Sequence, residues 1–275
     1  MLSTAWTAFA FLAIAEIAAI SEHFMVGLAG VSVRNNAGAV VEVNAETDFV
    51  ARNETFQTFV KSVARITLDA GDDIDALNAS AYPGTERNVQ EQLTHLIATI
   101  GENMVLRRIS VLQAEKGVLA SYIHNALAPG LGKIGALVSL ESDSAGYALD
   151  LLGKQLAMHV AAAKPQAISG DDLDPDVVTR EKVILVEQAR DSGRPDDIIK
   201  KMVEGRLRKF YEEVCLLDQT FVIDGETKVS QVIDVAAKEI GKPIVVNGFI
   251  LFILGERIKK EGDNFAAEVS AAAGV

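Results

Sequence analysis

Apolar and polar residues alternate in the run VSVRNNAGAVVEV (Val31–Val43), and the spacing then changes to that of a helix. Asn and Gly tolerate positive φ, so residues 26–43 are predicted to form a β-hairpin around the turn RNNAG. A helix is predicted from about Asn53, which is a good N-cap candidate. Its buried stripe should contain Phe56, Phe59, Val60, Val63 and Thr67, which recur at helical spacing.

Later stretches continue the mixture of helices and strands. Strands are predicted in NMVLRRISVLQA, GVLASYIH, IGALVSLES and PIVVNGFILFILGE, and helices in residues 85–101, 147–165 and 228–241. Residues 174–217 are predicted to form two antiparallel helices, because only the short turn GRP separates them. The pattern leaves two placements of this helical hairpin open: packed inside the fold, or projecting for dimerisation or partner contact.

The layout repeats itself. The strand GAVVEV, which starts at Gly38, corresponds to GALVSL, which starts at Gly135, and the helices that follow align with Lys61 on Lys154. A strand–strand–helix unit therefore occurs twice. The copies differ at the corner between strand and helix, which reads NAETDFVARNET in the first and ESDSAGY in the second. A longer corner in only one copy is a candidate for function.

The predicted fold class is α+β, with two related strand–strand–helix subdomains, an inserted antiparallel helical hairpin and a C-terminal helical module. The predicted segments are an atypical apolar segment (1–24), a first α+β subdomain (25–125), a second α+β subdomain (126–173 with 218–260), the hairpin (174–217) and the C-terminal module (261–275).

Composition narrows the class of protein. The chain has 275 residues, of which 49% are hydrophobic and 23% charged, and this is typical of a globular protein. The net charge of −12 argues against a free-standing nucleic-acid-binding protein, which usually carries a basic patch. A single cysteine, Cys215, excludes an internal disulfide and favours a reducing, cytoplasmic setting.

The first 24 residues are apolar and contain no Lys or Arg. Their uncharged run ends at Glu16, which is short of the roughly 20 residues that a membrane span needs, and a secretory signal would carry a positive start. Three interpretations are open: a cleaved signal or anchor, a buried or partner-facing helix, or a start that is not native to this fold. The last is favoured, and no membrane association is expected.

No group of residues indicates catalysis, so the protein is not expected to be an enzyme, and no metal or cofactor is expected. GLGKIG (Gly130–Gly135) matches G-x-G-x-x-G, but its glycines lead into a strand, whereas a dinucleotide site needs them to open a helix. The four histidines lack ligand-like spacing. His159 is expected to be a partly buried or surface residue, and His124, at the end of a strand, is a candidate contact residue.

The stretch VEVNAETDFVARN (Val41–Asn53) closely resembles the signature of the elongation factor Ts family. Further matches follow in the family's order: GENMVLRR, YIHN, GKIGALVSLES, LAMHVAAAKP, EGRLRKFYEEVCLLDQTFV and FAAEV. The resemblance extends from about Met25 to the C-terminus. It implies a guanine-nucleotide exchange factor that binds elongation factor Tu and promotes GDP release during translation elongation.

The resemblance also implies roles for particular residues. Thr47, Asp48, Phe49 and Val50 match the element that inserts beside the switch-side helices of the partner's GTPase domain. His124 matches a residue that contacts the third domain of elongation factor Tu, and Phe265 belongs to a C-terminal module that meets the GTPase domain again. No direct contact with nucleic acid is implied, and self-association through the helical hairpin is possible.

One departure leaves an alternative function open. The family normally begins with a small ubiquitin-associated-like domain that also binds the GTPase domain, and Met1–Phe24 does not resemble it. The alternative is therefore a partner-binding module with little exchange activity.

Phe49 has two interpretations from the pattern. It lies seven residues before Phe56, so a continuous helix would place it on the buried stripe. However, Arg52 and Asn53 between them are polar. The absence of this corner from the second copy and the family resemblance both favour a partner-facing aromatic residue.

Overall fold

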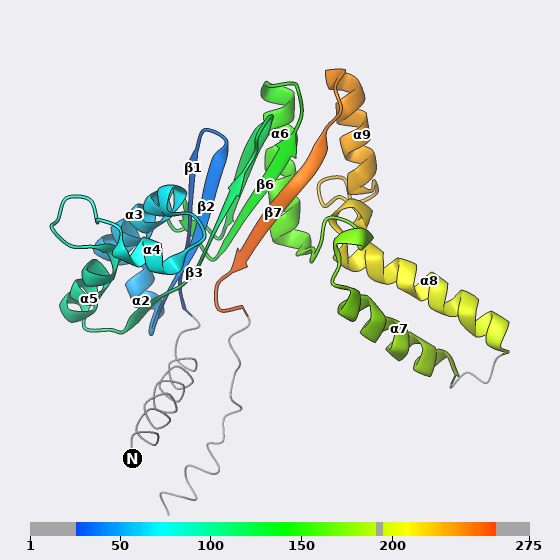
Figure 1. Ribbon diagram of the computed structural model, residues 1–275, viewed down its shortest axis with the longest axis horizontal. Helices are drawn as coiled ribbons and strands as arrows, with labels where there is room; N and C mark the ends of the chain where they lie inside the picture. The colour runs from blue at the N-terminus through cyan, green and yellow to red at the C-terminus, as the bar shows by residue number, and fades with distance from the viewer. Residues whose placement is uncertain (1–25, 191–194, 257–275) are drawn as a thin grey trace, which may run out of the picture.

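The computed structural model describes residues 26–190 and 195–256. It has the predicted α+β fold, and the layers run helix, sheet, sheet, helix (Figure 1). The two sheets pack face to face in the middle. The expected 1–24 segment and the C-terminal module with Phe265 lie outside the described residues.

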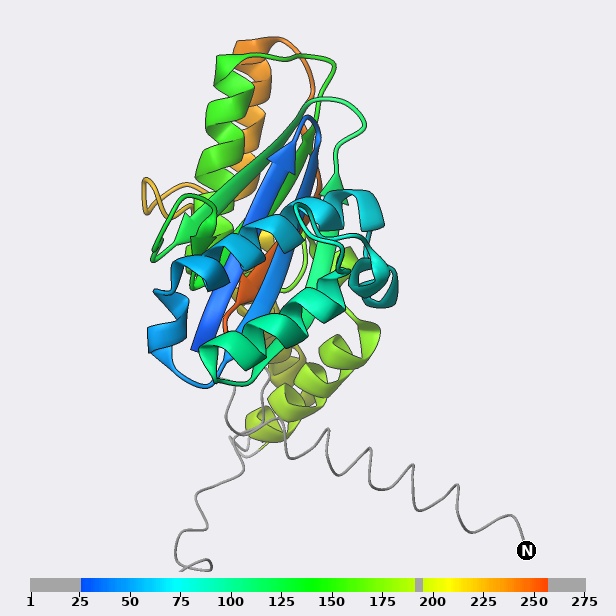
Figure 2. The same ribbon diagram turned by 90° about the vertical axis from the view of Figure 1, so that its left-hand side faces the viewer.

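The first sheet has the strand order β3-β2-β1-β5, and all neighbouring strands are antiparallel. Helices α3 and α5 lie across its outer face (Figure 2). The elements are β1 (Val26–Arg34), β2 (Ala37–Ala45), α2 (Asp48–Ala51), α3 (Glu54–Ala70), α4 (Ile74–Ala79), α5 (Val89–Ile100), β3 (Met104–Gln113) and β5 (Leu131–Gly132).

The second sheet has the order β4-β6-β7, again antiparallel, and α6 and α9 cover its outer face. Two helices, α7 and α8, lie between α6 and α9 in the sequence. The elements are β4 (Val118–His124), β6 (Ile134–Glu141), α6 (Tyr147–Ala163), the 3₁₀ turn η1 (Gly170–Asp172), α7 (Pro175–Arg190), α8 (Asp196–Val214), the 3₁₀ turn η2 (Leu216–Asp218), α9 (Val229–Ile240) and β7 (Val245–Ile253).

Strand pairing differs from the boundary expected after residue 125. β4 falls within the predicted first subdomain, but it pairs with β6 in the second sheet. The short β5, assigned to the second subdomain, pairs with β1 in the first sheet. Each sheet thus takes one strand from the other side of that boundary, because pairing depends on which edge is free and not on order along the chain.

The repeat is visible in the strand order. β1, β2 and β3 of the first sheet correspond to β4, β6 and β7 of the second, with the middle strand of each triplet paired to both others. A register shift lies between Glu42 and Val43 in β2 and between Ser139 and Leu140 in β6. These two pairs are equivalent when GAVVEV is aligned on GALVSL, so both copies carry a bulge at the same place.

Three apolar cores lie between the four layers. The first packs α3 and α5 on the first sheet, and the last packs α6 and α9 on the second. Between the sheets, Val40 and Leu119 pack with Leu137 and Phe252. β2 is buried along almost its whole length because it has a layer on each face.

Local signals in the sequence give the expected elements. Asn35, at φ 56°, turns the β1–β2 hairpin. The Asn53 side chain accepts hydrogen bonds from the Thr55 and Phe56 amides and so caps α3. All five residues predicted for the buried stripe of α3 are buried. Gly101 ends α5 in the left-handed conformation, as an αL C-cap.

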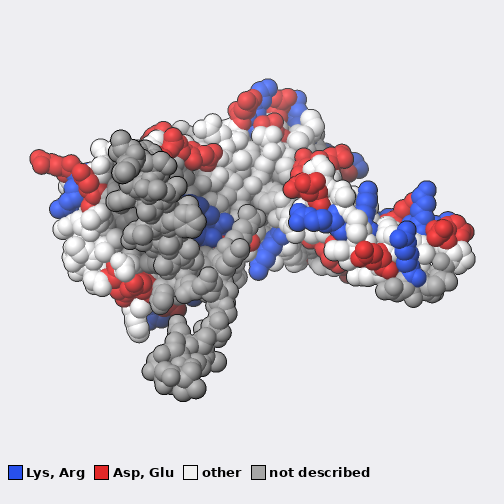
Figure 3. All heavy atoms as spheres, turned by 60° about the horizontal axis from the view of Figure 1, so that its bottom comes forward, with Lys and Arg blue, Asp and Glu red and all other residues white. Residues whose placement is uncertain are grey.

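The helical hairpin of α7 and α8 projects away from the body (Figure 1), so the projecting placement is the observed one. Basic and acidic side chains alternate along it (Figure 3). Val183 and Ile184 on α7 are about half exposed. Within the described residues, no helix is long and apolar enough to cross a membrane.

His159 on α6 is fully buried, which corrects the expectation of a partly buried or surface residue. Its Nδ1 accepts from the Val222 amide at 3.2 Å, so the ring proton lies on Nε2, which donates to the Gln219 Oε1 at 2.9 Å. Burial lowers the pKa of the His159 imidazole, and the folded protein therefore holds the ring neutral.

The free energy of unfolding is expected to fall as the pH drops below about 6.5, the pKa of an unfolded histidine, because only the unfolded chain gains the proton on His159. The loss approaches about 1.4 kcal/mol per pH unit, until the pH reaches the lowered pKa of the folded state. Urea titrations of the protein and of His159→Gln between pH 7.5 and 5 measure it. Equal pH slopes for the two proteins would contradict this assignment.

Candidate functional site

The corner between β2 and α3 contains its own short helix, α2, which separates Phe49 from the buried stripe of α3. The chain leaves α2 at Arg52, and Asn53 is extended at ψ 124° before α3 begins. The backbone therefore turns between Phe49 and Phe56. Because the two residues are not on one continuous helix, Phe49 is not held to the buried face.

The corner is anchored on both sides. Val50 and Ala51 are buried in the first core. The backbone amide and hydroxyl of Thr47 donate to the Glu102 carboxylate, at 3.1 and 2.7 Å. The Gln57 side chain donates to the Ala51 carbonyl at 2.9 Å. Of the four residues predicted for this contact, Thr47 and Val50 therefore fix the turn.

The other two residues face outward. Phe49 is 82% exposed, the highest value among the large hydrophobic side chains of the described residues. Asp48 is also largely exposed, and its carboxylate lies 3.8 Å from the Lys133 Nζ. A pair this exposed contributes little to stability. The corner thus holds an aromatic ring and a carboxylate side by side on a fixed backbone, and within residues 26–190 and 195–256 the ring is left largely uncovered.

His124 lies at the exposed end of β4, where Tyr122 OH is 3.2 Å from its Nδ1. It borders a groove of about 430 Å³ whose wall is mostly apolar and includes Met158, Val222 and Ile223. The Lys133 amide donates to the His124 carbonyl at 3.1 Å, and the Lys133 side chain approaches Asp48. Lys133 therefore lies between the corner and the groove.

The glycines of GLGKIG are explained by close packing. A Cβ on Gly130 would lie 2.9 Å from the Val31 carbonyl oxygen, and one on Gly132 would lie 2.7 Å from that of His124. The motif runs from β5 into β6, and no helix begins there. The prediction that it is not a dinucleotide loop agrees with this geometry.

Other candidate chemistry is weak in the described part of the chain. No group of three His, Cys, Asp or Glu side chains there is arranged to hold a metal ion. Burial raises the pKa of the Cys215 thiol to about 11, so at neutral pH it is protonated and a poor nucleophile.

Sequence reasoning missed the residues that support the site. Glu102 accepts the hydrogen bonds that hold the corner. In the sequence, it is marked only by its position directly after Gly101, which ends a helix. Lys133 has no signal beyond its place in the glycine-rich motif GLGKIG. Glu42 is not among the predicted site residues either, although it is a charged residue in the apolar run GAVVEV and is fully buried.

Comparisons with a family model and with curated proteins identify the same family. The family described as Elongation factor TS matches residues 46–256. An elongation factor Ts from Rhodospirillum rubrum is 59% identical over 246 residues, which cover 89% of this chain and 80% of that protein. An elongation factor Ts from Gluconobacter oxydans is 56% identical over 248 residues, which cover 90% of this chain and 80% of that protein. With the anchored corner and the repeated α+β units in place, the chain belongs to the elongation factor Ts family.

Proposed function

We propose that this protein is a guanine-nucleotide exchange factor that binds elongation factor Tu and promotes GDP release during translation elongation in the cytoplasm. Membership of the elongation factor Ts family supports this function. The observation that carries it is the exposed Phe49 on a turn anchored by Thr47 and Val50. An aromatic ring held this way in water is poorly explained by stability alone.

Exchange requires no acid, base or metal from this protein. It must bind the nucleotide-free or distorted GTPase more tightly than the GDP-bound one, since only that difference in affinity can expel GDP. By reciprocity, GDP weakens the binding of the exchange factor by the same ratio. A rigid contact element suits this task, because a flexible one would adapt to both states of the partner and lose the difference.

In this proposal the corner inserts beside the switch-side helices of the GTPase domain. Phe49 wedges between partner side chains, where a buried aromatic anchor contributes strongly to binding. Asp48 brings a carboxylate towards the magnesium and phosphates, where it competes for the metal and repels the phosphates. Its exposed pair with Lys133 is weak enough to exchange for a contact with the partner.

A second contact involves the other sheet. On the family resemblance, we assign His124 and the groove beside it to the third domain of elongation factor Tu. The groove offers a mostly apolar wall with the exposed side chains of Val222 and Ile223 at its edge. Phe265, from the C-terminal module, is assigned to the GTPase domain on the family resemblance. Contacts on two domains of the partner would fix its orientation relative to the corner.

We also assign self-association to the projecting hairpin of α7 and α8. Val183 and Ile184 expose apolar surface there, among charges of both signs that can pair across an interface. Sedimentation velocity at increasing concentration should show a dimer that Val183→Ser with Ile184→Ser dissociates. A monomer at every concentration would contradict this assignment.

The function is tested with elongation factor Tu carrying fluorescent GDP, chased with excess unlabelled GDP. We expect this protein to accelerate release when present at a small fraction of the partner concentration, because each molecule acts repeatedly. If it forms a stoichiometric complex without faster release, it is the partner-binding module and not an exchange factor. If it forms no complex, both assignments fail.

A further inference from the structure

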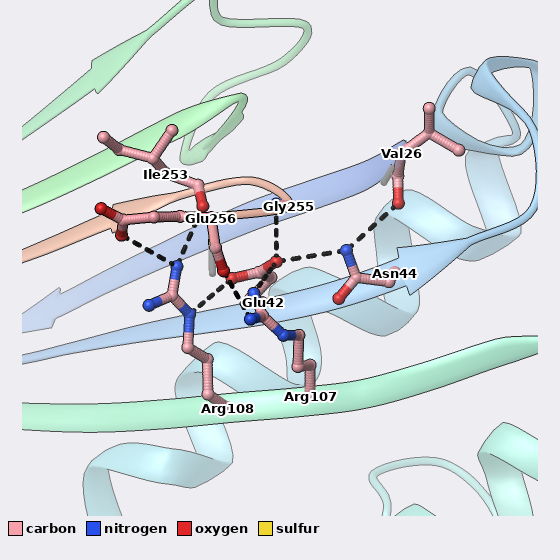
Figure 4. A network of polar contacts seen from close by, with 8 residues as sticks. All are labelled: Val26, Glu42, Asn44, Arg107, Arg108, Ile253, Gly255 and Glu256. Atoms are coloured by element: carbon pink, nitrogen blue, oxygen red, sulfur yellow. Dashed lines mark hydrogen bonds and ion pairs between the residues drawn. The ribbon is translucent and has the colours of Figure 1, made fainter. Parts of the chain in front are cut away.

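Glu42, in the middle of β2, is a fully buried carboxylate at the centre of a polar network (Figure 4). Its Oε1 accepts from Arg107 Nη1 at 2.9 Å, from the Gly255 amide at 2.9 Å and from Asn44 Nδ2 at 3.1 Å. Its Oε2 accepts from Arg108 Nε at 2.5 Å. Each carboxylate oxygen of Glu42 is therefore hydrogen-bonded to a charged guanidinium, and Oε1 also accepts from a backbone amide and a side-chain amide.

The bulge in β3 explains how two consecutive arginines reach one carboxylate. Neighbouring residues in a regular strand point to opposite faces of the sheet. Here Glu42 pairs with Arg108 and Val43 pairs with Leu106, so Arg107 is the extra residue of the bulge. Two residues of β3 then oppose one of β2, which lets both guanidinium groups turn to the same side.

Both arginines also reach the last described residues of the chain. Arg107 Nη2 donates to the Glu256 carbonyl at 2.5 Å, and Arg108 Nη2 donates to the Ile253 carbonyl at 2.9 Å. The guanidinium of Arg108 stacks over the Phe252 ring at 4.2 Å. The network therefore joins the first sheet to the point where the chain leaves β7 towards residues 257–275.

The second copy of the repeat provides an internal comparison. Ser139 is the buried equivalent of Glu42, next to the same bulge, and its hydroxyl donates to the Gln113 carbonyl at the end of β3. Each middle strand thus contacts the end of the third strand of the other sheet. The second copy therefore holds the equivalent place with one neutral hydrogen bond and no charge.

Stability alone explains the charged version poorly. Burying a carboxylate and most of two arginine side chains costs free energy that their mutual attraction only partly returns, and apolar replacements of buried ion pairs are often as stable. A guanidinium group fixes the positions of its hydrogen-bond partners, because its donors lie in one plane. A network of this kind is therefore suited to holding the connected backbone segments in a fixed relative position.

We propose that Glu42, Arg107 and Arg108 are positioning residues that fix where the chain after Glu256 leaves the body relative to the corner at Thr47–Val50. Glu42 lies on the same strand that leads into the corner, so one strand sets both positions. For activity, the inference rests on the proposed function, in which the corner and the C-terminal module both contact the GTPase domain. The geometric part does not depend on it.

Arg107→Lys tests the geometry without any partner. The lysine keeps the charge beside Glu42 but cannot donate to Glu42 and to the Glu256 carbonyl in one plane. We expect hydrogen exchange of the Gly255 amide to become about tenfold faster, while amides in the centre of β2 exchange as before. Ser139→Ala, which removes the neutral equivalent, is the matched control and should leave Gly255 unchanged. Unchanged Gly255 exchange in Arg107→Lys would overturn the proposal.

A double-mutant cycle on GDP release tests the consequence for activity. Arg107→Lys should lower stimulated release by about fivefold in the native background but have little effect in Phe265→Ala, since both act through the C-terminal module. In His124→Ala the same substitution should keep its full effect. If the fold-losses of Arg107→Lys and Phe265→Ala in stimulated GDP release multiply in the double variant, the two residues act independently. That result would overturn the positioning role in activity.

Two further outcomes are distinguishable. If no form of the protein accelerates GDP release, the proposed function fails, and the Gly255 exchange rate still decides the geometric role. If Arg107→Lys does not fold, Arg108→Lys replaces it in both measurements, because it loses the bond to the Ile253 carbonyl and keeps its charge.

Discussion

Phe49→Ala is expected to leave the protein folded and to slow stimulated GDP release from elongation factor Tu by about 30-fold, which corresponds to about 2 kcal/mol. The ring is 82% exposed, so its removal opens no cavity in the protein. The turn that carries it is held by the buried Val50 and by the Thr47–Glu102 hydrogen bonds, which the substitution does not touch. The loss should therefore appear only when the partner is present.

Stopped-flow release of fluorescent GDP measures this effect. Tyr147→Ala is the matched control, because Tyr147 is nearly as exposed, at 80%, but lies at the start of α6 in the other helix layer. It should release GDP at the native rate. A folded Phe49→Ala protein with native exchange, or an equal loss in Tyr147→Ala, would remove Phe49 from the mechanism.

Affinities for the nucleotide-free and GDP-bound forms of elongation factor Tu show whether Phe49 promotes release or only adds a contact. If Phe49 acts as a wedge, its removal weakens binding to nucleotide-free elongation factor Tu more than binding to the GDP form, since only this difference drives release. Titration of both forms, by calorimetry, gives the ratio. Equal weakening of both would mean that Phe49 adds affinity without promoting exchange.

Glu42→Ala is expected to lower the free energy of unfolding by about 3 kcal/mol. Breaking a buried ion pair from one side usually costs about 3–5 kcal/mol, because the remaining charge loses its partner. The value here falls at the lower end, since the side chains of Arg107 and Arg108 are 24% and 23% exposed and can be partly hydrated. Urea denaturation followed by circular dichroism measures the change.

Ser139→Ala provides the comparison at the equivalent position of the second copy. It removes one neutral hydrogen bond of 3.3 Å and should cost only about 1 kcal/mol. If Glu42→Ala costs no more than Ser139→Ala, the buried carboxylate is not the centre of a coupled network.

Much of the fold could be predicted because its signals are local. The turn at Asn35, the Asn53 cap and the Gly101 end depend on backbone preferences of single residues. The stripe on α3 follows from helical spacing, and the duplication follows from matched strand sequences. The fully buried His159 was missed, because no local pattern shows which hydrogen-bond partners a fold will bring to a histidine.

The α+β elements, the repeat and the family could be predicted from the amino-acid order, since these depend on residues close together in the chain or on recognisable motifs. The three-dimensional arrangement of the chain set the pairing of β4 in the second sheet and the projection of the helical hairpin. It also decided that two arginines meet on Glu42, because a one-residue bulge changes the face to which a strand residue points. The exposure of Phe49 also depends on the path of the backbone. Its seven-residue spacing to Phe56 favours a buried position on a continuous helix, but the break between α2 and α3 directs the Phe49 side chain to the solvent.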